Sequence, residues 1–393
     1  MLHTQLPNIV VIAAGGGNDI FSAIAYIKAH LHQHSFEKIA LIGLLGFTPF
    51  HSNSELHPTN INIEHPIIIP SESMHRYLSF HKWDGDSRNI ETIQEIYANE
   101  RLLPTILANI CPEVKHYLCL SPKYSAIEQS VNITRHLIEL GFNPENTTLN
   151  IVDFGGDILT NGNQSSIISP DLDAYTLSLV SNMPYKSILS VCFPGVDGEL
   201  PHDYLTECCS KSISQEPINK DLWRLYLNKL YNYIRDYRPG NTIPNMLKIL
   251  DTSSEIVSKI TVKKSWHING KKLILTKEME INPALQSMVY FFTLPIDNPF
   301  TVVFSSKDYD LYMVMKHIMS IYNGQEIKDA VQSSDLHLQY LRKDIYGKWT
   351  NKHILLDGSQ EVMLVNVIPN GLNHESIPIF HNKSAQYDTL YLQ

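Results

Sequence analysis

Short, nearly continuous apolar runs alternate with amphipathic segments over the first two hundred residues. Apolar runs of this kind predict strands covered on both faces, and apolar residues recurring at helical spacing predict helices. The expected strands span residues 8–14, 38–47, 116–120, 150–154 and 187–193. Expected helices follow at 19–34, at 124–140 and from Ser169-Pro170 onward. The alternation predicts an α/β fold, with a mostly parallel sheet sandwiched by helices in a macrodomain-like or Rossmann-like three-layer arrangement.

The pattern changes after residue 219. The expected elements there are a helix at 221–237, a hairpin of 260–268 and 271–277 around Asn269-Gly270, helices at 308–322 and 336–345, and a hairpin around Asp357-Gly358. Asn-Gly and Asp-Gly pairs favour the tight type I′ turn of hairpins. We therefore expect an α/β catalytic domain over 1–215 and a C-terminal α+β region over 216–393 packed on it.

One long segment, residues 53–88, lacks a regular pattern and is rich in His, Pro, Ser and Asn. Its apolar stretch covers 67–69. Long loops in compact domains are usually functional, so we expect a lid or binding element.

Composition narrows the classes of partner. A net charge of −9 with no cluster of lysine or arginine disfavours a nucleic-acid partner. The apolar runs are too short to span a bilayer, so no membrane insertion is expected. No charged-then-apolar leader opens the chain, which predicts a cytoplasmic location. The five cysteines lack metal-ligand spacing and are expected to be reduced thiols.

Three of the expected strands end in a loop that combines glycine with a carboxylate. In chain order the loops are Gly15-Gly16-Gly17-Asn18-Asp19, Gly155-Gly156-Asp157 and Pro194-Gly195-Val196-Asp197-Gly198-Glu199. The carboxyl ends of parallel strands share one edge of a sheet, and ligands bind in the crevice there. The three loops should therefore place several carboxylates around one cleft.

The first loop leads into a helix, whose free backbone N–H groups favour a phosphate or diphosphate. It is a poor dinucleotide fingerprint, because Ile20 stands where the third glycine is expected. The Walker pattern also fails, because no Lys-Ser or Lys-Thr follows the glycines. A helix cap at Asp19 is the competing structural interpretation of this loop.

The other carboxylates carry similar alternatives. Asp157 suits a turn on conformational grounds alone. Asp153 is harder to explain structurally, because a carboxylate at the end of a buried strand costs free energy unless it is paired. Asp173 lies in the first turn of the helix expected after Ser169-Pro170, where it can face the cleft. No nucleophile elbow or locally activated cysteine is found, so carboxylate-driven hydrolysis fits better than covalent catalysis.

The motifs GGGND, FGGDIL, SPDLDAYTL and PGVDGEL resemble, over roughly residues 8–215, a widespread prokaryotic family of uncharacterised α/β proteins. The chain is also similar to Legionella-type effectors that act as ADP-ribosyl-arginine hydrolases with a rearranged macrodomain-like fold. Macrodomains place the Gly-Asp-Ile segment before the glycine-rich loop, whereas here Gly156-Asp157-Ile158 follows Gly15-Gly16-Gly17. Asp157 could therefore contact adenine or act near the scissile ribose.

The resemblance implies a hydrolase that removes mono-ADP-ribose from arginine of a target protein, with secretion into a host cell as an alternative location. The ADP-ribose moiety would be the partner, with its diphosphate on the first loop, and Phe154 or Phe21 would stack on a ring. No cofactor is expected, with Mg²⁺ as the alternative. The candidate catalytic residues are Asp19, Asp157 and Asp173. The candidate ligand-binding residues are Gly15, Gly16, Gly17, Asn18, Asp153, Phe154, Gly155, Gly156, Gly195 and Asp197.

Two other functions stay open. One is a Mg²⁺-dependent nucleotide or sugar-nucleotide hydrolase that uses Asp153, Asp157 and Asp197. The other is a non-catalytic ADP-ribose or nucleotide-binding module.

Overall fold

The computed structural model describes residues 6–15, 19–31, 34–44, 67–70, 103–120, 126–164, 167, 170–235, 242–252, 258–268, 271–302, 304, 337–343 and 349–355. No helix within these ranges is long and apolar enough to cross a membrane.

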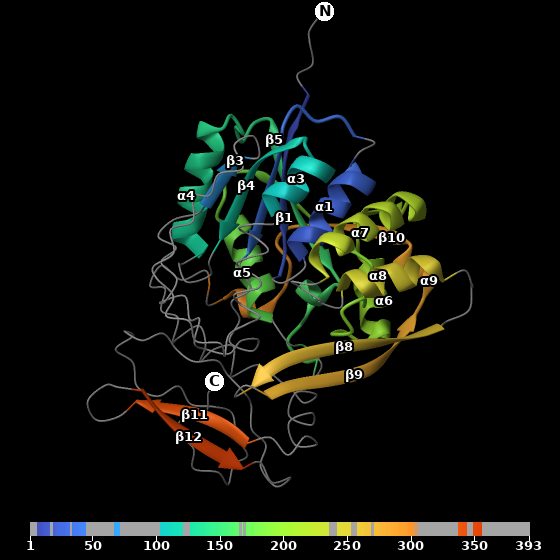
Figure 1. Cartoon of the computed structure of the whole chain (residues 1–393). Helices are drawn as coiled ribbons and strands as arrows, with labels where there is room; N and C mark the ends of the chain where they lie inside the picture. The colour runs from blue at the N-terminus through green and yellow to red at the C-terminus, as the bar shows by residue number, and fades with distance from the viewer. Residues whose placement is uncertain are drawn as a thin grey trace, which may run out of the picture.

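Eight strands of the described residues form one sheet in the order β3-β4-β2-β1-β5-β6-β10-β7 (Figure 1). The strands are β1 (Asn8–Ala13), β2 (Ile39–Leu44), β3 (Ile67–Pro70), β4 (Val114–Leu120), β5 (Thr147–Phe154), β6 (Lys186–Cys192), β7 (Ser214–Pro217) and β10 (Met288–Thr293). The five strands from β4 to β6 are parallel, whereas β3, β10 and β7 each run antiparallel to a neighbour. The predicted α/β fold with a mostly parallel sheet is confirmed.

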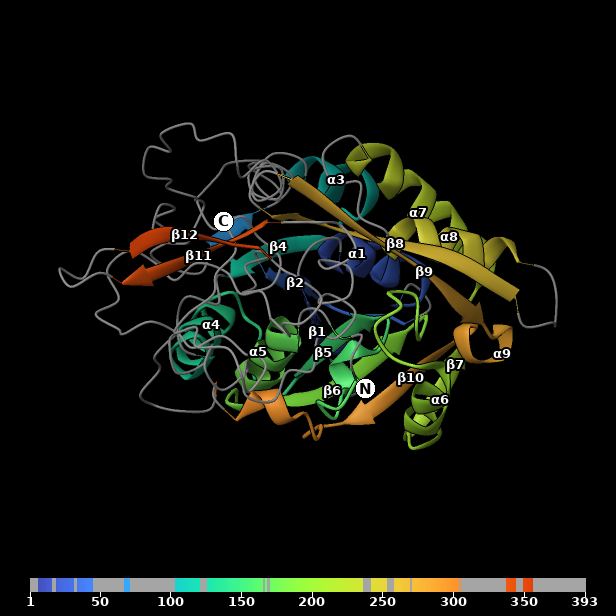
Figure 2. The same cartoon turned by 90° about the horizontal axis from the view of Figure 1, so that it is seen from below.

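Helices cover both faces of the sheet and make two hydrophobic cores (Figure 2). One face carries α1 (Asp19–Ala29), α3 (Leu103–Ile110), α7 (Lys220–Ile234) and α8 (Thr242–Asp251). The other face carries α4 (Ala126–Glu139), α5 (Pro170–Ser181) and α6 (His202–Ser210). The central strands contribute apolar side chains to both cores, which explains why their sequences are nearly continuous in apolar residues.

The strand order reverses beside β1. The chain runs from β1 to β2 on one side, and after β4 it crosses to place β5 on the other side of β1. The Ala14 N–H donates to the Val152 carbonyl at 2.9 Å, so the pairing of β1 and β5 continues to the ends of the strands. Such a switch point opens a crevice at the carboxyl ends of the strands, where ligands of α/β proteins bind.

A closed polar network lies inside the sheet, below that crevice. Asn150 on β5 donates to the Tyr26 hydroxyl at 2.8 Å and accepts from the Ser190 hydroxyl at 2.8 Å. The Tyr26 and Ser190 oxygens are 3.2 Å apart, which closes the triangle. All three side chains are buried, so their mutual hydrogen bonds offset the loss of contact with water.

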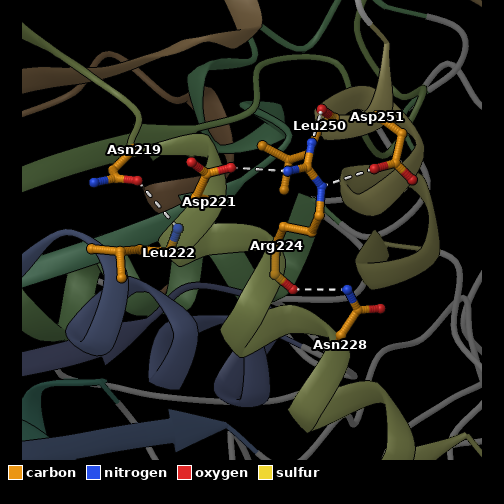
Figure 3. A network of polar contacts seen from close by, with 7 residues as sticks. All are labelled: Asn219, Asp221, Leu222, Arg224, Asn228, Leu250 and Asp251. Atoms are coloured by element: carbon orange, nitrogen blue, oxygen red, sulfur yellow. Dashed lines mark hydrogen bonds and ion pairs between the residues drawn. The ribbon is translucent and has the colours of Figure 1, made fainter.

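Helices α7 and α8 are joined by one arginine (Figure 3). Arg224 donates from Nε to Asp251 at 2.9 Å and from Nη2 to the Leu250 carbonyl at 2.6 Å. Its Nη1 lies 3.1 Å from the Asp221 carboxylate in the first turn of α7. The guanidinium thus connects the start of one helix to the end of the next.

The later part of the chain differs from expectation in two respects. The predicted hairpin around Asn269-Gly270 is confirmed as β8 (Ser258–Ile268) and β9 (Lys271–Ile281), which pair antiparallel. The predicted helix at 336–345 is wrong, because β11 (His337–Lys343) pairs with β12 (Trp349–Leu355). A short apolar run does not distinguish strand from helix by periodicity, and pairing with β12 decides the outcome.

Some expectations lie outside the described residues, namely the helix at 308–322, the turn at Asp357-Gly358 and most of the segment 53–88. Within that last segment, residues 67–70 form β3, a strand at one end of the sheet. The sheet also includes β10, which comes from the part of the chain that we assigned to the C-terminal region. Residues beyond 216 therefore complete the sheet that residues before 216 begin.

Candidate active site

The three glycine–carboxylate loops follow β1, β5 and β6, three adjacent strands of the sheet. Asp157 opens a short 3₁₀ helix, η5 (Asp157–Leu159), directly after the second loop, and α5 begins at Pro170. The loops and α5 bring six carboxylates to the switch point. They are Asp19, Asp153, Asp157, Asp173, Asp197 and Glu199.

Two triads of carboxylates share one member. In the first, one oxygen each of Asp153, Asp157 and Asp173 lie within 4.8 Å of one another. In the second, the same criterion joins Asp157 to Asp197 and Glu199. Asp157, which is half-buried, therefore stands between two buried pairs.

Gly15 brings the first loop against the carboxylates. Its φ of +77° lies in the left-handed region that favours glycine. A Cβ at this position would lie 2.7 Å from Asp19 Oδ2 and 3.5 Å from Asp173 Oδ1. The absence of a side chain thus lets the backbone of the first loop reach two of the predicted catalytic residues.

The second and third loops lock together. Gly155 has a φ of +135°, and a Cβ there would collide with the Asp197 carboxylate. The Gly195 N–H donates to the Gly155 carbonyl, and the Gly156 N–H donates to Asp153 Oδ2 at 2.6 Å. The positions of Asp153 and Asp197 therefore depend on glycine at residue 155.

Three buried amides from beyond residue 240 hold these loops. Asn245 on α8 donates to the Val196 carbonyl at 3.2 Å, and Gln286 donates to the Pro194 carbonyl at 3.0 Å. Asn298 donates to the Ile158 carbonyl at 3.0 Å. The later part of the chain thus supports the backbone that carries the carboxylates.

Burial dominates the electrostatics of the cluster. It raises the pKa of Asp153 to about 8, and the neighbouring Asp197 carboxylate adds to the rise. Burial, followed by the repulsion of Asp173, raises the pKa of Asp157 well above its ordinary value. Burial also raises the pKa of Asp173, with Asp153 and Asp19 as the next causes. After burial, the largest cause of each rise in pKa is therefore another carboxylate.

Asp173 differs from the closed network inside the sheet. Asp173 is 2% exposed, and within the part of the chain that the structure describes its buried Oδ1 atom has no hydrogen-bond partner. The same atom is the one that faces Gly15. Buried carboxylate oxygens usually accept a hydrogen bond, so this atom is a candidate contact for a ligand.

The structure brings together most, but not all, of the predicted site residues. Gly16, Gly17 and Asn18 lie outside the described residues. The rings of Phe154 and Phe21 are both buried in the core, and that of Phe154 contacts Trp223 edge-on at 6.4 Å between centroids. We therefore assign no stacking role to either ring.

Sequence reasoning missed Glu199 as a site residue. It lies two positions after Asp197 in the same loop, is 4% exposed, and its N–H donates to Asp197 Oδ1 at 3.0 Å. The sequence pattern that pointed to Asp197 also applies to Glu199, because both are acids in the glycine-containing loop that follows a strand.

Residues 91–224 match a family model described as protein of unknown function (DUF1152). The match covers about a third of the chain, from before α3 to the first turn of α7. It includes five of the six clustered carboxylates and leaves out Asp19. No curated protein matches the chain.

Proposed function

We propose that this chain is a hydrolase that removes mono-ADP-ribose from arginine by carboxylate-assisted attack of water on the N-glycosidic bond. The observation that supports a hydrolase is the convergence of carboxylates from three strand-end loops and α5 at the switch point between β1 and β5. Oxygen-rich, partly water-excluded clusters of this kind suit acid–base chemistry, because burial brings carboxyl pKa values toward neutrality.

The chemistry needs a base for water and stabilisation of positive charge on the ribose. Asp19 begins α1, is half-buried and stands beside Gly15, so it is our candidate for orienting and deprotonating the water. Asp157 and Asp173 would face the ribose ring, whose transition state is oxocarbenium-like. The water oxygen bonds to the anomeric carbon, the bond to the guanidine nitrogen breaks, and the proton that Asp19 takes from the water passes to the leaving guanidine nitrogen.

The ADP-ribosyl part of the proposal has separate support. The motif series resembles that of ADP-ribosyl-arginine hydrolases, and the first loop leads into the N-terminus of α1, where free backbone N–H groups favour a phosphate. The switch-point crevice is also the place where α/β proteins bind nucleotides.

The test measures release of free ADP-ribose from a mono-ADP-ribosylated arginine peptide by chromatography. The wild-type chain is expected to release it, and Asp19→Asn to slow release by about 10²–10⁴-fold, the usual contribution of a general base. Asp203→Asn, which alters a fully exposed carboxylate on α6, is the matched control and should leave the rate unchanged. Absence of release by the wild type would reject the proposal.

A second candidate is a divalent-cation-dependent hydrolase of nucleotide or sugar-nucleotide diphosphates. It is favoured by the two triads that share Asp157. In a panel of ADP-ribose, a UDP-sugar and ATP with Mg²⁺, this function predicts cleavage of a phosphoanhydride bond that EDTA abolishes. Cleavage of the arginine-linked substrate alone would exclude it.

A further inference from the structure

We propose that Asp153, Asp157 and Asp173 bind a divalent cation of the Mg²⁺ or Mn²⁺ class. The site coincides with that of the proposed function, but cation binding as such does not depend on which substrate the chain hydrolyses.

The first support is geometric. One oxygen from each of the three side chains lies within 4.8 Å of the others. Around a cation with ligand distances of about 2.0–2.2 Å, oxygens on different sides of the ion are roughly 3–4 Å apart, so only small side-chain movements are needed. Three carboxylates and no sulfur or imidazole make a donor set that hard cations prefer.

The second support is the unpartnered oxygen of Asp173. This residue is 2% exposed, and its Oδ1 accepts no hydrogen bond from any residue that the structure describes. This oxygen lies 3.5 Å from the position that a Cβ on Gly15 would take, so the backbone of the first loop approaches it closely. A bound cation would give this oxygen a partner that the described residues do not supply.

The third support is the sign of the local charge. Asp153 and Asp173 are buried next to Asp197 and Glu199, which are also buried. After burial, the largest electrostatic effect on each of Asp153, Asp157 and Asp173 comes from another carboxylate. Ionised carboxylates buried together are costly unless protons or a cation neutralise them, so a cation would be bound favourably here.

The position of the site indicates what the cation would do. Beside Gly15 and at the start of α1, it would face the phosphate of a bound nucleotide and add a positive charge to the helix N-terminus. This role in binding phosphate rests on the proposed function, whereas the cation site does not.

The experiment titrates the purified full chain, after EDTA treatment and dialysis, with MnCl₂ and follows free Mn²⁺ by electron paramagnetic resonance. Wild type is expected to bind Mn²⁺, and excess Mg²⁺ to displace it. Asp173→Asn should weaken binding at least tenfold, or about 1.4 kcal/mol. Asp203→Asn removes an exposed carboxylate and should bind as wild type does.

Asp157→Asn protects the test against a variant that fails to fold, because this side chain is only half-buried. Its Mn²⁺ affinity should also fall at least tenfold, with an unchanged circular dichroism spectrum. No Mn²⁺ binding by wild type up to millimolar concentration, or binding that neither variant weakens, overturns the cation site.

The two proposals fail separately. Mn²⁺ binding without release of ADP-ribose from arginine rejects the proposed function and leaves the cation site standing. Release of ADP-ribose by a chain that binds no Mn²⁺ rejects the cation site and leaves the proposed function standing.

Discussion

Two sets of buried polar side chains meet at β5 and β6, and they differ in whether their members attract or repel one another. Asn150 on β5 and Ser190 on β6 form a closed triangle with Tyr26, in which each side chain hydrogen-bonds to the other two. Three residues after Asn150, the same strand presents Asp153 to a group of carboxylates, and burial and the neighbouring Asp197 raise its pKa. We call the triangle the inner set and the six clustered carboxylates the outer set. The inner side chains pair with one another, whereas outer carboxylates such as Asp153 and Asp173 repel one another.

The two sets differ in what they contribute to the free energy of unfolding. A closed neutral network gives modest net stabilisation, because its hydrogen bonds replace those to water. Like charges buried together oppose folding unless protons or a cation neutralise them. The inner triangle is therefore best understood as structural and the outer cluster as functional, and substitutions in the two sets should differ in kind.

The largest expected effect is on activity at the outer set. Asp157 belongs to both triads, so Asp157→Asn should lower the rate of ADP-ribose release by roughly 10³-fold or more, within the range that one acid–base or charge-stabilising group contributes. The melting temperature should stay within a few degrees of wild type. A variant that keeps more than a tenth of the wild-type rate would contradict the functional interpretation of the cluster.

The next largest effect is on stability at the inner set. Asn150→Leu leaves the Tyr26 and Ser190 hydroxyls without the Asn150 amide, which should cost about 1–3 kcal/mol of unfolding free energy. Urea denaturation followed by circular dichroism measures this loss. Lys186→Ala, at an exposed position of β6, is the control and should stay within about 0.5 kcal/mol. An equally stable Asn150→Leu protein would show that the triangle is dispensable.

A smaller effect distinguishes the two sets by pH. The pKa of Asp153 is raised to about 8 in the folded protein by burial and by Asp197, against about 3.9 in the unfolded chain. The folded state of the metal-free protein therefore holds the proton more tightly, so stability is greatest at low pH within this window and falls as pH rises from about 4 to 8.

Asp153→Asn should remove part of that decline. In EDTA at pH 8, the variant should be more stable than wild type by roughly 1–2 kcal/mol, because a buried charge among Asp157, Asp173, Asp197 and Glu199 is gone. At pH 5 the difference should shrink. Urea denaturation at the two pH values measures it, and a variant less stable than wild type at pH 8 would refute the expected sign.

The smallest effect is expected away from both sets. Arg224→Ala removes the contacts to Asp251, Asp221 and the Leu250 carbonyl, but the side chain is 36% exposed. Solvent screening limits such pairs, so the loss of stability should be about 0.5–1 kcal/mol. Thermal unfolding in low and high salt measures it, and a loss well above that of Asn150→Leu would reverse the ranking.

Much of the fold could be predicted because the central strands are buried on both faces and carry an unmistakable apolar pattern. The expected strand at 8–14 corresponds to β1 (Asn8–Ala13), and that at 187–193 corresponds to β6 (Lys186–Cys192). Strands at the margins of the sheet were harder. Ser214–Pro217 has no apolar pattern, and its strand is defined by pairing with β10.

The site was predictable in outline and not in detail. The glycine–carboxylate loops indicated which residues would meet at one edge, and the structure brings Asp153, Asp157, Asp173 and Asp197 together there. The amides of Asn245, Gln286 and Asn298 could not be foreseen. Their role depends on contacts between residues far apart in the chain, which no local pattern encodes.

The position of β10 has a consequence for how the chain is made. β6 is complete roughly a hundred residues before β10, so during synthesis one side of β6 has no partner. An unpaired strand edge is a template for association with other chains. A ribosome-bound or truncated product that stops near residue 215 would carry all six carboxylates and still expose this edge. The protein should therefore tolerate delayed synthesis of its second half poorly, and aggregation of such fragments is the expected sign.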